Sequence, residues 1–253
     1  MNRHARTLRR NHSAGPRRQR GQAMAEYIYV FPILIMLIMG AIQFGFIYQT
    51  KTTLNYATFS ATRQAALRNG SMSAIVDGLS SGMMPLFAHR ASNGGKLELP
   101  MLKTAWKLAN QQISDPKLTK ITIVSPTPAA LSAYKGQSET GNEIPNDNLM
   151  YRSTNIAGGG MNVQDANLLK VRVTYCYRMA VPVINRLIYH MVVDPPTSAS
   201  TGNTGAEMLA SKGGGATAKP CTGIDDQFRI PVTSEAVVRM QSPFRNPGKW
   251  VGP

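Results

Sequence analysis

Residues 27–50 carry no charged side chain, and this feature constrains the fold more than any other. As an α-helix, this stretch of 24 residues at about 1.5 Å per residue is about 36 Å long, enough to cross a hydrocarbon layer of about 30 Å. Residues 33–39 are only Ile, Leu and Met, which is typical of a membrane helix and not of a half-exposed surface helix. The sequence therefore predicts one membrane-spanning helix near its N-terminus.

The residues before this stretch are strongly basic. Residues 1–20 contain no acidic residue and seven arginines: Arg3, Arg6, Arg9, Arg10, Arg17, Arg18 and Arg20. The positive-inside rule places such a segment in the cytoplasm and the rest of the chain across the membrane. Without residues 1–21, 21 basic and 13 acidic residues remain, so the formal net charge falls from +15 to +8. An arginine-rich arm is also able to contact nucleic-acid phosphates, but its position beside the apolar stretch favours orientation, and we expect no nucleic-acid partner.

Gly21 and Glu26 flank the start of the apolar stretch. A secretory signal peptide has its small-residue cleavage site after the apolar run, and residues 43–50 contain no A-x-A sequence. The basic leader, Gly21, Gln22 and Glu26 instead resemble the type IV prepilin pattern, in which a membrane-embedded aspartyl peptidase cuts after the glycine. The pair Glu26-Tyr27 resembles the variant found in Flp pilins and TadE-like pseudopilins of tight-adherence (Tad) systems.

The resemblance to the TadE-like family covers about residues 17–70. Residues 30–45 are similar to its apolar helix with an early proline, Pro32, and a late glycine, Gly45. Residues 54–68 are similar to its alanine-rich continuation punctuated by arginine. Residues 71–253 carry no motif of comparable specificity.

The resemblance implies roles for four residues. Glycine at the cleavage site lets a peptidase approach the backbone, because it has no Cβ. Cleavage after Gly21 gives Gln22 a new α-amino group, and Glu26 lies one helical turn further on, followed by Tyr27. A carboxylate at a membrane border needs a partner, either the amine of its own chain or, as in the family's assembly, that of a neighbouring subunit. Alternatively, Glu26 only marks the interface and favours the helix N-terminus.

The predicted organisation is a leader at 1–21, a transmembrane and stem helix at 22–70, and an α+β head at 71–253 beyond the membrane. The stem helix continues to Leu67 or Arg68, since Asn69-Gly70 is a stop signal. Ala41 and Gly45 form a small-residue pair that suits helix packing.

The head is predicted to contain a few antiparallel strands and short helices packed on the end of the stem. We expect a helix after residue 71 that breaks at Gly82 and Pro85, and a second at 101–113 with Leu102, Trp106, Leu108 or Ala109, and Ile113 on its core face. Strands are expected at 120–124, 168–179 and 228–240, the last with Pro231 at an edge or bulge. Residues 183–189 predict a short amphipathic turn or helix, and 125–165 and 194–219 predict loops.

The two cysteines, Cys176 and Cys221, lie beyond the predicted membrane helix. A disulfide is the natural interpretation in an oxidising compartment, and a free buried thiol at Cys176 is the alternative. The four histidines have no metal-ligand spacing, and the acids at 142–147 and 225–226 lack the order of a calcium loop. We therefore expect no metal, no cofactor, no catalytic residues and no enzymatic activity.

The sequence favours a minor pilin or pseudopilin of a Tad/Flp (type IVb-like) pilus or related secretion system. Its expected partners are a prepilin peptidase, other pilins or pseudopilins, the inner-membrane assembly platform and the membrane itself. Its expected location is the bacterial inner membrane, as a single-pass protein with a periplasmic head, or the extracellular pilus. The alternative is a signal-anchored periplasmic binding or scaffold protein that is not processed as a pilin.

Overall fold

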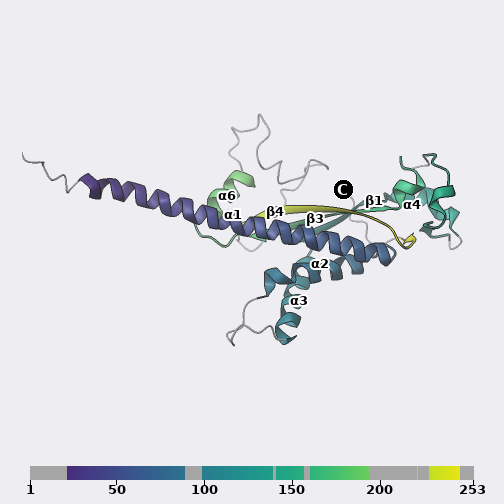
Figure 1. The fold of residues 1–253 in the computed structure, drawn as a ribbon, viewed down its shortest axis with the longest axis horizontal. Coiled ribbons are helices and arrows are strands. Elements are labelled where there is room, and N and C mark those ends of the chain that lie inside the picture. Colours follow the sequence, from purple (N-terminus) through teal and green to yellow (C-terminus); the bar gives the residue numbers. More distant parts are fainter. Residues whose placement is uncertain are drawn as a thin grey trace, which may run out of the picture.

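The computed structural model describes residues 22–88, 99–138, 141–156, 160–193, 221 and 228–245. One long helix runs through the molecule, and the other elements gather along its C-terminal part (Figure 1). The predicted α+β class with one long apolar helix is confirmed. The predicted leader and the predicted loop at 194–219 lie outside the described residues.

Helix α1 extends over Gln22–Leu67 as a single helix of 46 residues, which confirms the predicted stem. It continues through Pro32. It ends where Asn69 and Gly70 take positive φ angles of 57° and 72°, and the Gly70 N–H donates to the Ala65 carbonyl at 2.8 Å. Glycine adopts this conformation without steric cost, so the predicted stop signal is confirmed.

Helix α2, Met72–Phe87, runs back along α1. The predicted break at Gly82 and Pro85 is wrong, because α2 continues through both residues. Gly78 and Gly82 face α1, and a Cβ on Gly82 would lie 2.5 Å from the Cα of Ala57. Glycine here permits close packing of two helices and does not end one.

Helix α3, Leu99–Ser114, stands away from the stem (Figure 1). The predicted core face is wrong for Trp106 and Leu108, which are 38% and 39% exposed. The side that packs against α2 is narrower and is made by smaller residues, namely Ala105, Ala109 and Ile113.

The main sheet has the strand order β1–β3–β4, with antiparallel neighbours. Its strands are β1 (Thr119–Ser125), β3 (Leu168–Arg178) and β4 (Arg229–Arg239), which confirms the three predicted strands. Pro231 lies opposite Cys176 on β4, an edge strand of this sheet, as predicted. Both β3 and β4 pack against α1, so the stem forms part of the core of the head.

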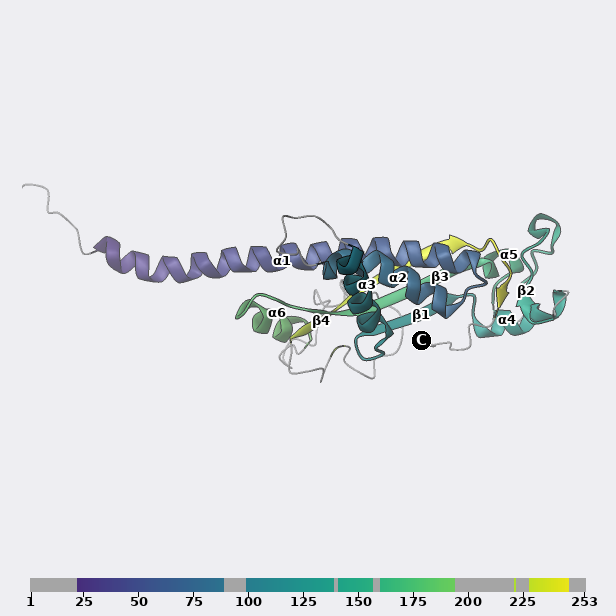
Figure 2. The same ribbon diagram turned by 90° about the horizontal axis from the view of Figure 1, so that it is seen from below.

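The segment 125–165, predicted to be a loop, contains regular structure in its described part, so that prediction is wrong. Thr127 caps a helix by accepting from the Ala130 N–H, with Pro128 in the first turn. These elements lie at the end of the molecule far from the N-terminus of α1 (Figure 2). They are α4 (Pro128–Tyr134), η1 (Lys135–Gln137), β2 (Glu143–Ile144), η2 (Leu149–Tyr151) and α5 (Val163–Ala166).

Residues 241–245 return to the C-terminal end of α1. Strand β5, Phe244–Arg245, pairs with β2. The Gln241 N–H donates to the Ala66 carbonyl at 3.1 Å, and the Arg245 N–H donates to the Asn69 carbonyl at 3.1 Å. The end of the stem helix is therefore capped by residues more than 170 positions further along the chain.

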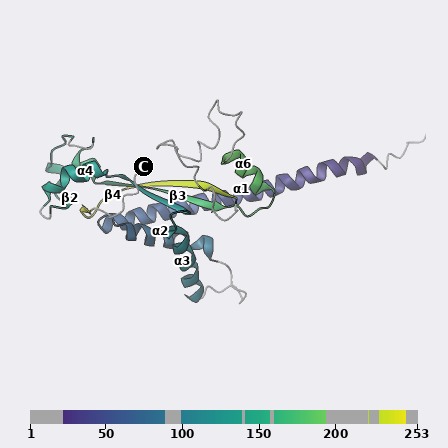
Figure 3. The ribbon, with the colours of Figure 1, turned by 180° about the vertical axis from the view of Figure 1, so that it is seen from behind.

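Helix α6, Ile184–Val192, confirms the predicted short amphipathic element. It follows β3 and lies beside α1, at the end of the sheet that points toward the stem's N-terminus (Figure 3).

Candidate assembly surface on the stem helix

The N-terminal part of α1 has almost no protein around it. None of residues 26–42, here called the uncovered segment, is buried. Among the described residues, α1 is the one helix long and apolar enough to cross a membrane. A continuous apolar surface of this kind is unstable in water and suits a hydrocarbon environment. Its large exposed side chains include Tyr27, Ile28, Phe31, Ile33, Leu34, Leu37, Ile38 and Ile42.

The residues singled out for processing and assembly lie at the start of this segment. Gln22 is the first residue of α1, and Glu26 follows one turn later with an exposed side chain. The Tyr27 ring stacks on Phe31, with ring centroids 5.1 Å apart and an interplanar angle of 24°. Gly21 lies outside the described residues. The helix thus brings Gln22, Glu26 and Tyr27 within its first two turns, and their roles stay predictions.

The head begins to cover α1 at Gln43, inside the uncharged stretch. The side chains of Gln43 and Thr50 are buried, and Gln43 Oε1 accepts a hydrogen bond from the Val181 N–H at 2.9 Å. Burial raises the pKa of the Tyr177 hydroxyl, opposed by its hydrogen bonds with Thr50 and Gln43. Two polar side chains of residues 43–50 are therefore buried against the head.

Past this junction, one face of α1 stays exposed along the whole length of the head. We call this face the outer stripe and define it as Tyr48, Tyr56, Phe59 and Leu67, which are 72%, 67%, 51% and 57% exposed. The opposite face is buried and contains Leu54, Ala57, Ala61 and Ala65. The outer stripe was not predicted from the sequence, although its aromatic residues recur at helical spacing.

A disulfide joins Cys176 on β3 to Cys221, across a sequence separation of 45 residues. Both cysteines are buried. The bond fixes residue 221 near the C-terminal end of the central strand β3, shortly before the chain leads into α6. This is the pairing that the sequence analysis expected in an oxidising compartment.

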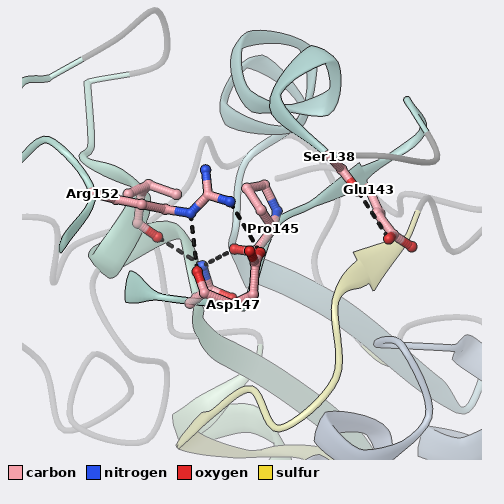
Figure 4. Close-up of polar contacts among 7 residues, drawn as sticks. Ser138, Glu143, Pro145, Asp147 and Arg152 are labelled. Atoms are coloured by element: carbon pink, nitrogen blue, oxygen red, sulfur yellow. Dashed lines mark hydrogen bonds and ion pairs between the residues drawn. The ribbon is translucent and has the colours of Figure 1, made fainter. Parts of the chain in front are cut away.

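The acids at 142–147 are engaged by arginines and a serine. Glu143 is buried, accepts from the Ser138 hydroxyl at 2.9 Å and pairs with Arg245 at 2.7 Å. Asp147 pairs with Arg152 at 3.0 Å, and Figure 4 shows this ion pair and the Ser138–Glu143 hydrogen bond. No group of three or more His, Cys, Asp or Glu side chains among the described residues could hold a metal ion. This cluster therefore acts as a structural ion-pair network at the far end of the head.

Comparison with known proteins identifies the stem. Residues 21–63 match the family model described as TadE-like protein. The stem is TadE-like. No match was found among curated proteins or among solved structures. The TadE-like match starts at Gly21, spans the uncovered segment and ends in the part of α1 that carries the outer stripe.

The TadE-like segment supports a pilin-like protein associated with a Tad pilus. The TadE-like family consists of structural pilus components and is not an enzyme family. Its single long apolar helix fits a single-pass membrane anchor. The family also indicates contact with other pilus components and with the membrane.

Proposed function

We propose that this protein is a minor pilin or pseudopilin that is cut after Gly21 by a prepilin peptidase and used to assemble a Tad pilus. In this proposal, residues 1–21 are a cytoplasmic leader, residues 22–70 form the membrane and filament helix, and residues 71–253 form a periplasmic head. The other partners are further pilins and the inner-membrane assembly platform. The TadE-like match over residues 21–63 supports this assignment.

The observation that carries the proposal is the outer stripe. A protein that only anchors its head needs an apolar helix surface inside the membrane and none beyond it. Here exposed apolar side chains continue past Lys51 and the end of the uncharged stretch, along the side of α1 that faces away from the head, where they share the surface with exposed polar residues such as Thr52 and Arg63. Exposed aromatic residues at helical spacing are suited to packing against another helix. The stripe therefore extends the membrane helix into a packing surface for neighbouring stems.

In this proposal, Glu26 determines how far neighbouring stem helices are shifted along the filament axis relative to one another. After cleavage, the α-amino group of Gln22 is a cation at the helix N-terminus, and the Glu26 carboxylate lies one turn deeper. At the membrane border the attraction between unlike charges is stronger than in bulk water, because the surroundings are less polar. A neighbouring subunit shifted along the axis so that its amine meets Glu26 gains this pairing, and other shifts do not.

The first test is the N-terminus of the protein purified from membranes that contain a cognate prepilin peptidase. We expect an intact mass that lacks 21 residues and a chain that begins at Gln22. Gly21→Lys should retain the leader, because a long side chain keeps the backbone out of the peptidase. Full-length chains in both cases would contradict the proposal and favour the anchored scaffold.

The second test concerns the outer stripe. Phe59→Asp removes an exposed ring of the stripe and adds a charge, whereas the control Ser132→Asp adds the same charge at an exposed polar position of α4, at the far end of the head. We expect Phe59→Asp to abolish recovery of the protein with sheared pili and Ser132→Asp to retain it. Circular dichroism of both variants verifies that the head is folded. Equal recovery of the two variants would remove the stripe from the assembly surface.

A further inference from the structure

Helix α6 has an apolar arc that is wider than the surface the head buries. Ile184 and Ile188 are only 4% and 6% exposed and face the head. Val183, Leu187 and Met191 follow one another at intervals of four residues, so they share one edge of the helix. These three side chains are 68%, 44% and 55% exposed. We call them the α6 edge.

The α6 edge lies at the level of the apolar stretch of α1. The Val181 N–H, just before α6, donates to Gln43 Oε1 at 2.9 Å. Farther toward the N-terminus of the stem, Met36 lines an open apolar groove together with Val183 and Leu187. Since residues 27–50 have no charge, α6 lies alongside the membrane segment and not beyond it (Figure 3).

The length of the uncovered segment also places α6 at the level of the membrane. The head covers α1 from Gln43, so residues 27–42 are left for lipid and span about 24 Å as a helix. A hydrocarbon layer is about 30 Å thick, which leaves about 6 Å unmatched. A helix lying in a bilayer interface buries its apolar face about 5–10 Å deep. Taking up the side of the head that carries α6 would supply the missing thickness without thinning the bilayer.

The charge around α6 suits a phospholipid surface. Residues 179–193 contain Arg186 and His190 and no acidic residue. Both side chains are exposed and lie beside the α6 edge around the same groove. The Arg186 guanidinium lies over the Phe228 ring, 5.6 Å from its centre, which keeps it close to the head. With α6 at the membrane interface, a cation at this position lies at the depth of the lipid phosphates.

The entry to α6 is strained. Val183 has φ 67° and ψ −55°, and the Ile184 N–H donates to the Pro182 carbonyl at 2.8 Å, which closes a three-residue turn. A β-branched residue is unfavourable at positive φ, and such strain is kept where surrounding structure requires it. Because Val183 is the N-cap of α6, this turn sets the direction of the helix and exposes an apolar side chain beside Met36.

We propose that the α6 edge lies in the head-side interface of the bilayer that α1 spans, with Val183, Leu187 and Met191 in contact with acyl chains and Arg186 at the phosphates. The molecule is then held in the membrane at two points, α1 and α6, and cannot rotate freely in the bilayer about the axis of α1. This proposal rests on α1 crossing the membrane and does not depend on cleavage after Gly21.

Depth measurements on the full chain test this proposal. Cys176 and Cys221 are paired, so a cysteine introduced by Leu187→Cys or Met191→Cys accepts a spin label selectively. The matched control is Ser132→Cys, an exposed position on α4 at the far end of the head. The probe is a vesicle of phosphatidylethanolamine and phosphatidylglycerol containing the reconstituted protein, and the readout is collision of the label with oxygen and with a water-soluble nickel chelate.

We expect the labels at 187 and 191 to collide several-fold more with oxygen than with the chelate, and the label at 132 to show the reverse. Chelate access at 187 and 191 equal to that at 132 would overturn the proposal, since the edge would then face water. Loss of access to both reagents would also overturn it, because the edge would be covered by protein. Circular dichroism of each labelled variant verifies the fold, and an uncleaved leader leaves the expected depth unchanged.

Discussion

The two parts of helix α1 meet different neighbours, and their side chains differ accordingly. The uncovered segment, residues 26–42, presents large Ile, Leu, Met and aromatic side chains, none of them buried, and it meets the head at Met36 and Met39. The covered part buries alanines, including Ala57, Ala61 and Ala65. Large apolar side chains suit lipid because they fill space next to flexible chains. Small side chains suit another helix, because they let two backbones approach.

Helix α2 makes this contrast concrete. A Cβ on Gly78 would lie 2.5 Å from the Cα of Ala61, so glycine on one helix meets alanine on the other. Gly45, on an exposed face of α1, has nothing within 4 Å of the same hypothetical atom. Gly78 on α2 is thus required by the close contact with α1, whereas Gly45 on α1 leaves a surface open to contact with another molecule.

The largest effect on the covered part should come from the disulfide. Cys176→Ala with Cys221→Ala opens a loop of 45 residues, and the chain-entropy relation gives a loss of about 4 kcal/mol in the free energy of unfolding. Urea unfolding in detergent, followed by near-ultraviolet circular dichroism, measures this loss. Membrane insertion should not change, because the bond lies in the head. An unchanged urea midpoint would contradict the expectation, and reduction of the unsubstituted protein is the control.

A charge added to the uncovered segment should weaken membrane insertion without changing the stability of the head. Leu37→Arg places a cation at an exposed position in the middle of the segment and raises the cost of insertion by about 3 kcal/mol. The fraction of protein that resists alkaline extraction from membranes should fall, while the urea midpoint of the head stays the same. Leu37→Ile is the matched control. A lower midpoint for Leu37→Arg would mean that the two parts are not independent.

The close contact between α1 and α2 should make the same substitution, glycine to alanine, have opposite effects at positions 82 and 45. Gly82→Ala inserts a methyl group against the backbone of Ala57 and should lower the free energy of unfolding by about 2 kcal/mol. Gly45→Ala meets open space and should raise helix stability by up to about 1 kcal/mol. The same urea titration compares them. Equal effects of the two substitutions would remove the close approach of α1 and α2 as the reason for glycine at 82.

The smallest effect should be the response of the head to acid through Glu235. Burial acts to raise the pKa of this carboxyl, but hydrogen bonds from Lys170, at 2.9 Å, and Arg172 hold it below its ordinary value of 4.5. A lowered folded-state pKa means that the stabilisation is present above pH 4.5 and is lost as the pH falls through the folded-state value. For a half-exposed pair this amounts to less than about 1 kcal/mol.

Comparing urea midpoints at pH 7 and pH 3 for the unsubstituted protein and Glu235→Gln measures this contribution. The glutamine variant should lose less stability between the two pH values, because its side chain does not titrate. An identical loss in both proteins would assign the acid response to other carboxyls.

The sequence predicted the parts of the fold that depend on local signals. The absence of charge over 27–50 and the Asn69-Gly70 stop define α1 because each acts on its own segment. The strand pattern at 168–179 likewise needed no information from elsewhere. Gly82 was misread because its reason lies on another helix, 25 residues away, and local rules treat glycine as a breaker.

The errors in the head have similar causes. Thr127 and Pro128 form a valid helix start, but the polar composition of 125–165 concealed it. Strands β2 and β5 have two residues each and pair across about a hundred positions, too short for any periodic signal. The processing residues Gly21, Gln22 and Glu26 were found by motif and stay predictions. The outer stripe and the α6 edge required knowing which faces the head leaves exposed.

The hydrogen bonds from residues 241–245 to the end of α1 impose an order of events on the newly made chain. Neither the cap on Ala66 and Asn69 nor the pairing of β5 exists until residue 245 is available. Closing so long a loop is slow compared with forming a local helix. The stem is therefore ready to enter a membrane well before the head around it is finished. Each chain is then held by its anchor while its last strand arrives.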